Sequence, residues 1–353
     1  MIRICLVPKL NGVGGMVSFQ HKLAAGLLRR GVEVCYDLGD RPYDAVLVIG
    51  GIRQLRGLWQ ARRRGVPVVQ RLDGMNWIHR VRRTGLRHAL RAEYGNFILA
   101  LIRSRLALRI VYQSEFARRW WEDVRGPAPG RWSVVYNGVD LEVYTPHGPA
   151  QRPDSDYRVL LVEGSLMGGY EMGLEAAVEL TCGLAERQQT AYRQTRPGKV
   201  ELLVVGRVPE TVQRSWQQRL AQDGRASIVS LHWAGLAPRE RIPEIDRSAH
   251  LLYSSDVNPA CPNSVIEGLA CGLPVAAFDT GALSELVTGD AGRIAPYGGD
   301  PWRLERPNIP ALVQAASEIL EDQPRFRAAA RARAETAFGL DQMVDGYLEA
   351  LLA

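Results

Sequence analysis

Short apolar runs alternate with helix-type patterns along the first half of the chain. Strands are expected at residues 2–7, 32–36, 45–49, 66–69, 108–112 and 133–136. The first two runs are separated by the loop Asn11-Gly12-Val13-Gly14-Gly15 and by a helix whose apolar side holds Met16, Phe19, Leu23 and Leu27. A strand, a glycine loop and a helix at this spacing predict a parallel, doubly wound sheet.

The second half of the chain repeats this plan after a polar, proline-rich stretch at residues 145–156, which we interpret as a linker. Further strands are expected at 158–162, 200–205, 227–231, 251–253 and 275–278. Helical patterns follow at 309–321, 325–338 and 342–352, and the last has an apolar side formed by Met343, Tyr347, Leu348 and Leu351. With 353 residues the chain is long enough for two α/β domains with proper cores.

Composition narrows the class of protein. The charged and apolar fractions are those of a globular domain, and no apolar run approaches the roughly 18 residues of a membrane span. The first residues are typical of a buried strand, so no signal peptide is expected. The five cysteines are scattered, without metal-binding spacing, which favours a reduced, cytoplasmic protein with unpaired thiols.

The net charge of +6 is unevenly distributed. Between Arg53 and Arg131 there are 18 arginines against five acidic residues. This stretch fits a solvated surface, and it also fits an anionic membrane surface, because Trp77, Ile78 and residues 80–91 and 97–102 mix aromatic, apolar and basic side chains. No nucleic acid is expected as a partner, since no other feature is typical of a nucleic-acid-binding module.

The segment from Ser254 to Val287 carries the most specific pattern. After a polar loop, Asn263 or Ser264 is expected to cap a short helix that Gly272 and Pro274 end. A strand follows at 275–278, and Thr280-Gly281 is expected to open another helix. The N–H groups at the start of the short helix suit a phosphate, and the carboxylate of Glu267 can accept two hydrogen bonds from a diol such as a ribose.

This segment resembles the nucleotide-sugar-binding segment of the retaining GT-B glycosyltransferases of family 4, also called glycosyl transferases group 1. The residues that carry the resemblance are Glu267, Ala270, Cys271, Gly272, Pro274 and Val275. The loop with Gly14 and Gly15 and the turn Asn137-Gly138-Val139-Asp140 come in the family's order.

The resemblance implies the GT-B fold, in which two Rossmann-like, doubly wound parallel-sheet domains face a cleft. It implies an acceptor domain at residues 1–148, joined by a C-terminal helix at about 339–353 that crosses back to it. A nucleotide-sugar-binding domain is expected at residues 156–338.

The implied reaction transfers a hexose-type sugar from a nucleotide sugar to a glycan, lipid-linked or small-molecule acceptor, with retention of configuration and without a metal. A UDP- or GDP-sugar is the expected donor, and no cofactor is expected. The enzyme would be cytoplasmic, or peripheral on the inner membrane face. The resemblance assigns donor binding to Gly14, Gly15, Gly164, Ser165, Gly206, Arg207, Trp233, Asn258, Asn263, Ser264, Val265 and Glu267.

The sequence departs from the family's pattern at two places. Ser165 stands near the position of an arginine that would hold the diphosphate, and no lysine follows it; Pro259 stands where the family has a second glutamate. Arg207 or an arginine of the first domain must then neutralise the charge of the diphosphate. Two alternatives remain open: a degenerate nucleotide-sugar-binding or scaffold protein, and a nucleotide-sugar epimerase of the same fold.

On the acceptor side, the loop from Arg71 to Trp77 follows a strand at its carboxyl end, where open α/β sheets place their sites. By resemblance, Asp73 is the nearest match to a histidine that many family members have close to the reacting sugar. Asp73 would orient the acceptor hydroxyl or stabilise the oxocarbenium ion. Alternatively, Asp73-Gly74 simply forms a tight turn.

Overall fold

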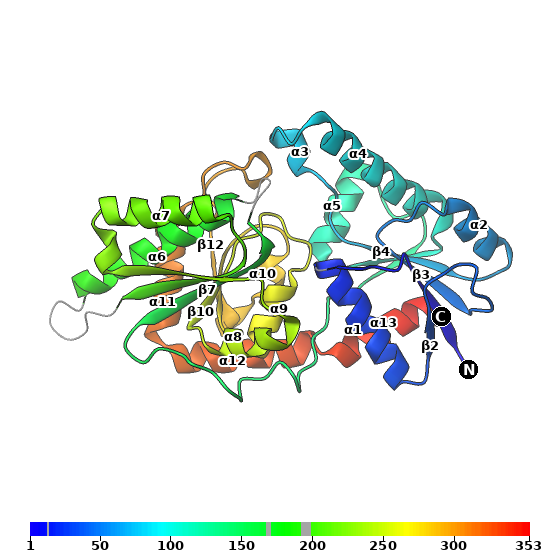
Figure 1. The fold of residues 1–353 in the computed structure, drawn as a ribbon. Coiled ribbons are helices and arrows are strands. Elements are labelled where there is room, and N and C mark those ends of the chain that lie inside the picture. Colours follow the sequence, from blue (N-terminus) through cyan, green and yellow to red (C-terminus); the bar gives the residue numbers. More distant parts are fainter. Residues whose placement is uncertain (13, 167–170, 192–198) are drawn as a thin grey trace. The chain divides into compact units, whose positions relative to one another are not determined.

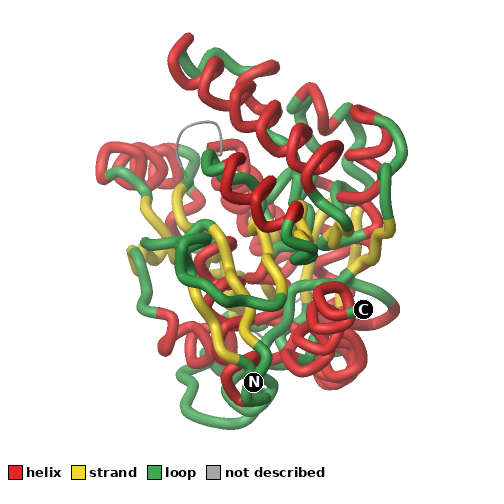
Figure 2. Tube along the Cα trace, turned by 90° about the vertical axis from the view of Figure 1, so that its right-hand side faces the viewer, coloured by secondary structure: helices red, strands yellow, loops and turns green. Residues whose placement is uncertain are grey.

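The computed structural model describes residues 1–353 except residues 13, 167–170 and 192–198. The chain forms two compact units. Unit 1 comprises residues 1–139, 259–261 and 337–353, and unit 2 comprises residues 140–258 and 262–336. Each unit contains a six-stranded sheet flanked by helices (Figures 1 and 2). The expected linker at 145–156 therefore falls within unit 2.

The sheet of unit 1 is parallel throughout and has the strand order β2-β1-β3-β4-β5-β6. Its strands are β1 (Arg3–Val7), β2 (Glu33–Cys35), β3 (Ala45–Ile49), β4 (Val68–Leu72), β5 (Arg109–Tyr112) and β6 (Arg131–Val134). After β2 the chain returns to the other side of β1, so the winding reverses between β1 and β3. Open parallel sheets bind ligands at the carboxyl ends of the strands beside such a reversal.

Helices pack on both faces of this sheet. They are α1 (Gly15–Arg29), α2 (Leu55–Arg63), α3 (Ile78–Val81), α4 (Leu86–Leu101), the π-helical turn η1 (Ile102–Leu106), α5 (Glu115–Arg125) and α13 (Leu340–Leu352). On one face α1 and α13 share an apolar cluster, in which the rings of Phe19 and Tyr347 lie 5.1 Å apart. Of the apolar side predicted for α1, Phe19, Leu23 and Leu27 are buried, but Met16 is 43% exposed.

The sheet of unit 2 is also parallel and has the order β12-β11-β10-β7-β8-β9. Its strands are β7 (Tyr157–Ser165), β8 (Val200–Arg207), β9 (Val229–Gly235), β10 (Leu251–Ser254), β11 (Val275–Phe278) and β12 (Gly292–Ala295). The chain winds from β7 to β9 in one direction and then returns to the other side of β7. The reversal in this unit therefore lies between β7 and β10.

The helices of unit 2 complete its two outer layers. They are α6 (Glu171–Ala191), α7 (Glu210–Gln222), α8 (Ile242–Arg247), α9 (Asn263–Ala270), α10 (Leu283–Leu286), α11 (Ile309–Glu321) and α12 (Gln323–Ala337). Short 3-10 turns lie between them: η2 (Arg225–Ser227), η3 (Arg239–Arg241), η4 (Gly289–Ala291) and η5 (Pro301–Arg303). A large cluster of buried apolar side chains lies between the sheet and helices α6 and α11.

Several local predictions are wrong, three of them in segments close to the candidate sites. The residue before helix α9 is Pro262, so neither Asn263 nor Ser264 is its cap; Asn263 is already helical, and no side chain caps the helix. The helix expected to open at Thr280-Gly281 begins at Leu283. Strand β4 runs to Leu72 rather than ending at residue 69, which moves Arg71 into the sheet. The bounds of β3, β11 and α11 are confirmed.

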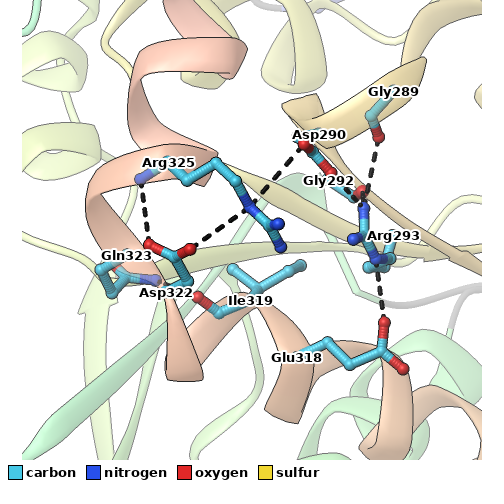
Figure 3. A network of polar contacts seen from close by, with 9 residues as sticks. All are labelled: Gly289, Asp290, Gly292, Arg293, Glu318, Ile319, Asp322, Gln323 and Arg325. Atoms are coloured by element: carbon cyan, nitrogen blue, oxygen red, sulfur yellow. Dashed lines mark hydrogen bonds and ion pairs between the residues drawn. The ribbon is translucent and has the colours of Figure 1, made fainter.

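Strand β12 was not predicted, because its four residues include a glycine and an arginine. Polar contacts hold this edge strand against α11 and α12 (Figure 3). Arg293 of β12 contacts Glu318 of α11 at 2.9 Å and Asp290 at 3.1 Å. Arg325 of α12 lies 3.7 Å from the same Asp290 carboxylate. Ion pairs thus hold the edge strand in place, and the few apolar residues of the strand would not have predicted it.

All five cysteines are buried and none of them forms a disulfide bond with another. Within the part of the chain that the structure describes, no helix combines the length and the apolar character needed to cross a bilayer.

Candidate functional site

The carboxyl end of the unit 2 sheet gathers several of the predicted donor-binding residues. Gly164 and Ser165 end β7, and Gly206 and Arg207 end the neighbouring β8, where Ser165 and Arg207 are register partners. Asn258 follows β10, on the other side of β7. The residues therefore come together at the winding reversal, where the topology favours a ligand site.

Gly206 allows the backbones of β7 and β8 to approach closely. Its φ is +149°, and a Cβ atom at this position would lie 2.2 Å from the carbonyl oxygen of Glu163. Any side chain would therefore push the two strands apart. Around Gly164, in contrast, a Cβ atom would meet nothing within 4 Å, so the end of β7 is open. Arg207 is exposed and forms no ion pair with a described residue.

Two carboxyl groups lie at the same reversal and were not predicted as site residues. The Ser255 hydroxyl donates a hydrogen bond of 3.0 Å to Oε1 of Glu163. Burial, and next the charge of Asp256, raise the pKa of Glu163 well above its usual value, and the Ser255 bond only partly opposes this. Burial also raises the pKa of Asp256 to about 6. Protons bound to this pair reduce the negative charge at the end of the sheet.

Helix α9 borders this group. Asn263, Ser264 and Val265 form its first turn, in which N–H groups point away from the helix body. Glu267 follows one turn later and is 9% exposed. Its charge, after burial itself, is the second cause of a raised pKa at Asp246 of α8, so the two carboxyl groups lie close together. Glu267 and Asp246 thus form a buried carboxyl pair where α8 and α9 meet.

Trp233 and Asn258 offer hydrogen-bond donors that no described residue uses. The indole Nε1 of Trp233, on β9, and the Nδ2 of Asn258 are both buried without an acceptor in the described residues. Asn258 also has a φ of +56°, a left-handed conformation that asparagine tolerates. Buried donors without acceptors are costly, so both atoms are suited to a ligand.

Unit 1 has a cavity of about 350 Å³ at its own reversal. The loop after β3, the loop after β4 and one side of helix α4 form its walls. Apolar side chains, including Leu10, Met16, Ile52, Ile98 and Leu99, line much of it. The charged and polar lining residues are Arg53, Asp73, Asn76, Arg91 and Tyr94.

Asp73 lies directly after β4 and lines this cavity. Burial raises its pKa above the usual value, although the charge of Arg71 opposes this. The indole of Trp121 donates a 2.7 Å hydrogen bond to the Asp73 carbonyl oxygen. A Cβ atom at Gly74 would lie 2.3 Å from the ring of Trp120, so a glycine is needed there for packing. The loop is therefore held by α5, with the Asp73 side chain at the cavity.

Arg71 is 1% exposed and lies in the core of unit 1. Its guanidinium lies 3.8 Å from the centre of the Phe19 ring and donates to Asn137 at 3.0 Å. Because Arg71 is buried, it is not one of the unit 1 arginines that can contact a ligand's phosphate. Arg53 and Arg91 are exposed, line the cavity and form no ion pair with a described residue.

Gly14 and Gly15 lie at the start of helix α1, next to Met16 of the cavity wall. Gly14 has a φ of +134°, and a Cβ atom there would meet nothing within 4 Å. The loop therefore uses glycine for its backbone conformation and leaves open space above the helix start. Val13, in the same predicted loop, and residues 167–170, which follow Ser165 and Leu166, lie outside the described residues.

Sequence reasoning missed Arg53, Arg91, Tyr94 and the carboxyl pair of Glu163 and Asp256. Two signals could have found the first group. Arg53 follows the predicted strand at 45–49, and residues 91, 95 and 98 recur at helical spacing on one side of α4. The carboxyl pair has no sequence signal, because it depends on which strands are neighbours.

Comparison with known structures defines the class of fold. Sucrose-phosphate synthase from Thermosynechococcus elongatus superposes with a TM-score of 0.71 at 14% identity, over 99% of this chain and 98% of that one. HepE from Anabaena, in a complex with UDP, superposes with a TM-score of 0.66 at 16% identity, over 99% of each chain. The protein has the GT-B fold of glycosyltransferases.

The sequence comparisons find similarity to glycosyltransferases over part of the chain. Residues 181–322 match the model of the family described as glycosyl transferases group 1. The lipopolysaccharide core biosynthesis mannosyltransferase LpsB of Rhizobium meliloti (strain 1021) is 31% identical over 129 residues, or 36% of this chain and 34% of LpsB. The alignment thus spans about a third of that relative's length.

Proposed function

We propose that the protein transfers a hexose-type sugar from a nucleoside diphosphate sugar to a glycan, lipid-linked or small-molecule acceptor, with retention and without a bound metal. One observation carries this proposal. The group 1 segment at residues 181–322 contains the end of β8, the loop after β10 and helix α9, which together border the reversal of unit 2. HepE was solved with UDP, which makes UDP-sugars, with GDP-sugars, the first donors to test.

In the proposed donor site, the first turn of α9 and Arg207 bind the diphosphate. Negative charge grows on this leaving group in an oxocarbenium-like transition state, so these donors stabilise the transition state more than the ground state. Glu267 accepts hydrogen bonds from the ribose, and the unpaired donors of Trp233 and Asn258 supply further contacts. Gly206 and Gly164 keep the strand ends accessible.

The cavity of unit 1 is the proposed acceptor site. Asp73 accepts a hydrogen bond from the acceptor hydroxyl there and orients it for reaction. No protein nucleophile is assigned. We further propose a cytoplasmic protein that associates with the inner membrane face.

Nucleotide binding tests the donor site directly. Thermal unfolding is measured with UDP, GDP, ADP and TDP, because a ligand at 100 times its Kd stabilises the fold by about 2.7 kcal/mol. Arg207→Gln should weaken the preferred nucleotide by about tenfold, the worth of a charge-assisted contact. Arg214→Gln is the matched control, since Arg214 is exposed on α7 with 69% of its side chain accessible. No stabilisation by any nucleotide would reject the donor site.

The carboxyl pair of Glu163 and Asp256 favours one second candidate, a nucleotide-sugar epimerase, because epimerisation needs groups that exchange protons. The two activities separate without knowledge of the acceptor. An epimerase converts the donor sugar into its epimer in the absence of any acceptor, and chromatography of the sugar detects it. A transferase leaves the configuration at that carbon unchanged. Nucleotide binding without either reaction would indicate a scaffold protein.

A further inference from the structure

Helix α4 of unit 1 exposes an unusual apolar side. Leu86, Leu90 and Phe97 are 77%, 63% and 57% exposed. They lie four and seven residues apart along a regular helix, so they fall on the same side of it. Helices α3 and α4 form the upper margin of unit 1 in Figure 1. Several large apolar side chains exposed on one side of a helix mark an interaction surface more often than chance exposure.

Positive charge surrounds this row. The segment from Ile78 to Leu101 holds the arginines Arg80, Arg82, Arg83, Arg87 and Arg91. Its one acidic residue, Glu93, is already bonded to Arg80 at 2.7 and 3.0 Å and to His79 at 2.9 Å. The other arginines of the segment form no ion pair with any described residue. The surface therefore carries a row of apolar side chains with uncompensated positive charge beside it.

The opposite side of α4 is anchored in the unit. Ala92, Asn96, Ile98 and Leu99 are buried. The side chain of Asn96 accepts from the backbone N–H of Asn76 at 2.9 Å and donates to its carbonyl oxygen at 2.8 Å. Because Asn76 lines the unit 1 cavity, one helix connects that cavity to the exposed row. The exposed row is thus the outer side of a well-packed helix rather than a frayed segment.

We propose that α4 docks unit 1 on an anionic lipid bilayer, with Leu86, Leu90 and Phe97 in the interface and with Arg83 and Arg87 on headgroup phosphates. A nucleic acid would match the arginines but would bury none of the apolar row. An anionic bilayer offers phosphates and an apolar layer at the depths that an amphipathic helix presents. The docking does not depend on the transfer reaction, although it would bring the cavity of unit 1 close to acceptors held in lipid.

Vesicle sedimentation of the full chain tests the docking. The protein should sediment with vesicles that contain phosphatidylglycerol, and about 1 M salt should release much of it, because the screening length is then only about 3 Å. With pure phosphatidylcholine it should stay in solution. The triple variant Leu86→Ser, Leu90→Ser and Phe97→Ser should reduce partitioning at least about tenfold. Arg83→Ser with Arg87→Ser should reduce it several-fold, on anionic vesicles alone.

Leu28→Ser is the matched control, because Leu28 is a 59% exposed leucine on helix α1 of the same unit, and it should sediment as the wild type does. Unchanged thermal unfolding and nucleotide stabilisation of the triple variant would show that it is folded. No sedimentation with anionic vesicles would overturn the proposal. So would sedimentation that the triple substitution leaves intact, since it would reveal a surface that binds any polyanion through its arginines alone. These readouts require no turnover, so they are independent of the proposed reaction.

Discussion

The winding reversals of the two units differ in their charged side chains. In unit 1, Arg53 and Arg91 line a cavity beside β1 and β3 without partner carboxylates among the described residues. In unit 2, the half-buried carboxyl groups of Glu163 and Asp256 lie at the ends of β7 and β10. Topology places both candidate sites at the carboxyl ends of parallel strands. The side chains that follow the strands then decide which charge a ligand meets.

This difference has a consequence for each ligand. The unit 1 cavity combines apolar walls with Arg53, Arg91 and Asp73, so the proposed acceptor would meet charges of both signs there. Unit 2 would bind a diphosphate mainly through backbone N–H groups and Arg207, with two carboxyl groups nearby. A diphosphate is accommodated best when those groups hold protons. Substitutions in either unit can test this comparison.

The largest effect is expected at Asp73. Asp73→Asn removes a base from the unit 1 cavity but keeps its size, so transfer should slow by at least about a hundredfold, the usual worth of general-base catalysis. Nucleotide affinity, measured by thermal shift, should not change, because Asp73 belongs to unit 1. Full activity of this variant would assign Asp73 to the loop structure that Trp120 and Trp121 hold.

A smaller effect on nucleotide affinity is expected from protonation of the carboxyl groups in unit 2. Nucleotide affinity should rise as the pH falls through about 6, the pKa of Asp256, because protonation removes negative charge beside the diphosphate. Asp256→Asn should bind tightly at pH 7.5 and should lose this part of the pH dependence. Isothermal titration of both proteins between pH 5.5 and 8 measures it. The nucleotide's own phosphate titrates in this range, so only the difference between the two proteins is informative. Equal pH profiles would show that the pair does not face the ligand.

The smallest effect is expected from a substitution that makes unit 2 more like the family that it resembles. Ser165 is exposed at the end of β7 and is the register partner of Arg207. Ser165→Arg adds a cation near the position where the family has one, so it should tighten diphosphate binding several-fold at low salt. Titration with the nucleotide and, as a control, with the uncharged nucleoside separates this effect from a change in base binding. A variant that binds the diphosphate no better would place Ser165 away from the ligand.

Sequence patterns predicted the sheets well because buried parallel strands are short, uninterrupted apolar runs. β3 and β11 match the predicted ranges, whereas β12, with Gly292 and Arg293, has no such run and is held by ion pairs. The cap of α9 was assigned to the wrong residue. Asn263 and Ser264 are polar and therefore suggested a cap, but Pro262 occupies the cap position.

The candidate site was predictable only in part. Gly206 and Arg207 end a clear strand, so their place at the sheet edge follows from the sequence. The pairing of Glu163 with Asp256 does not, because these residues are distant in the chain and meet only through the order of β7 and β10. The sequence also misplaced Arg71. We expected this residue in a loop, but β4 is longer than predicted and Arg71 lies in the core.

The last helix of the chain completes the first unit. Val139 and Gly339 form a parallel bridge, and α13 then covers the same apolar cluster as α1, with the Cβ position of Gly26 only 2.4 Å from Val344. During synthesis, Phe19, Leu23 and Leu27 therefore emerge from the ribosome long before their cover exists. At about 5–20 residues per second this interval is on the order of tens of seconds. Unit 2 has by then been made, so the first unit to appear is the last to finish folding, and its apolar side needs protection from aggregation meanwhile.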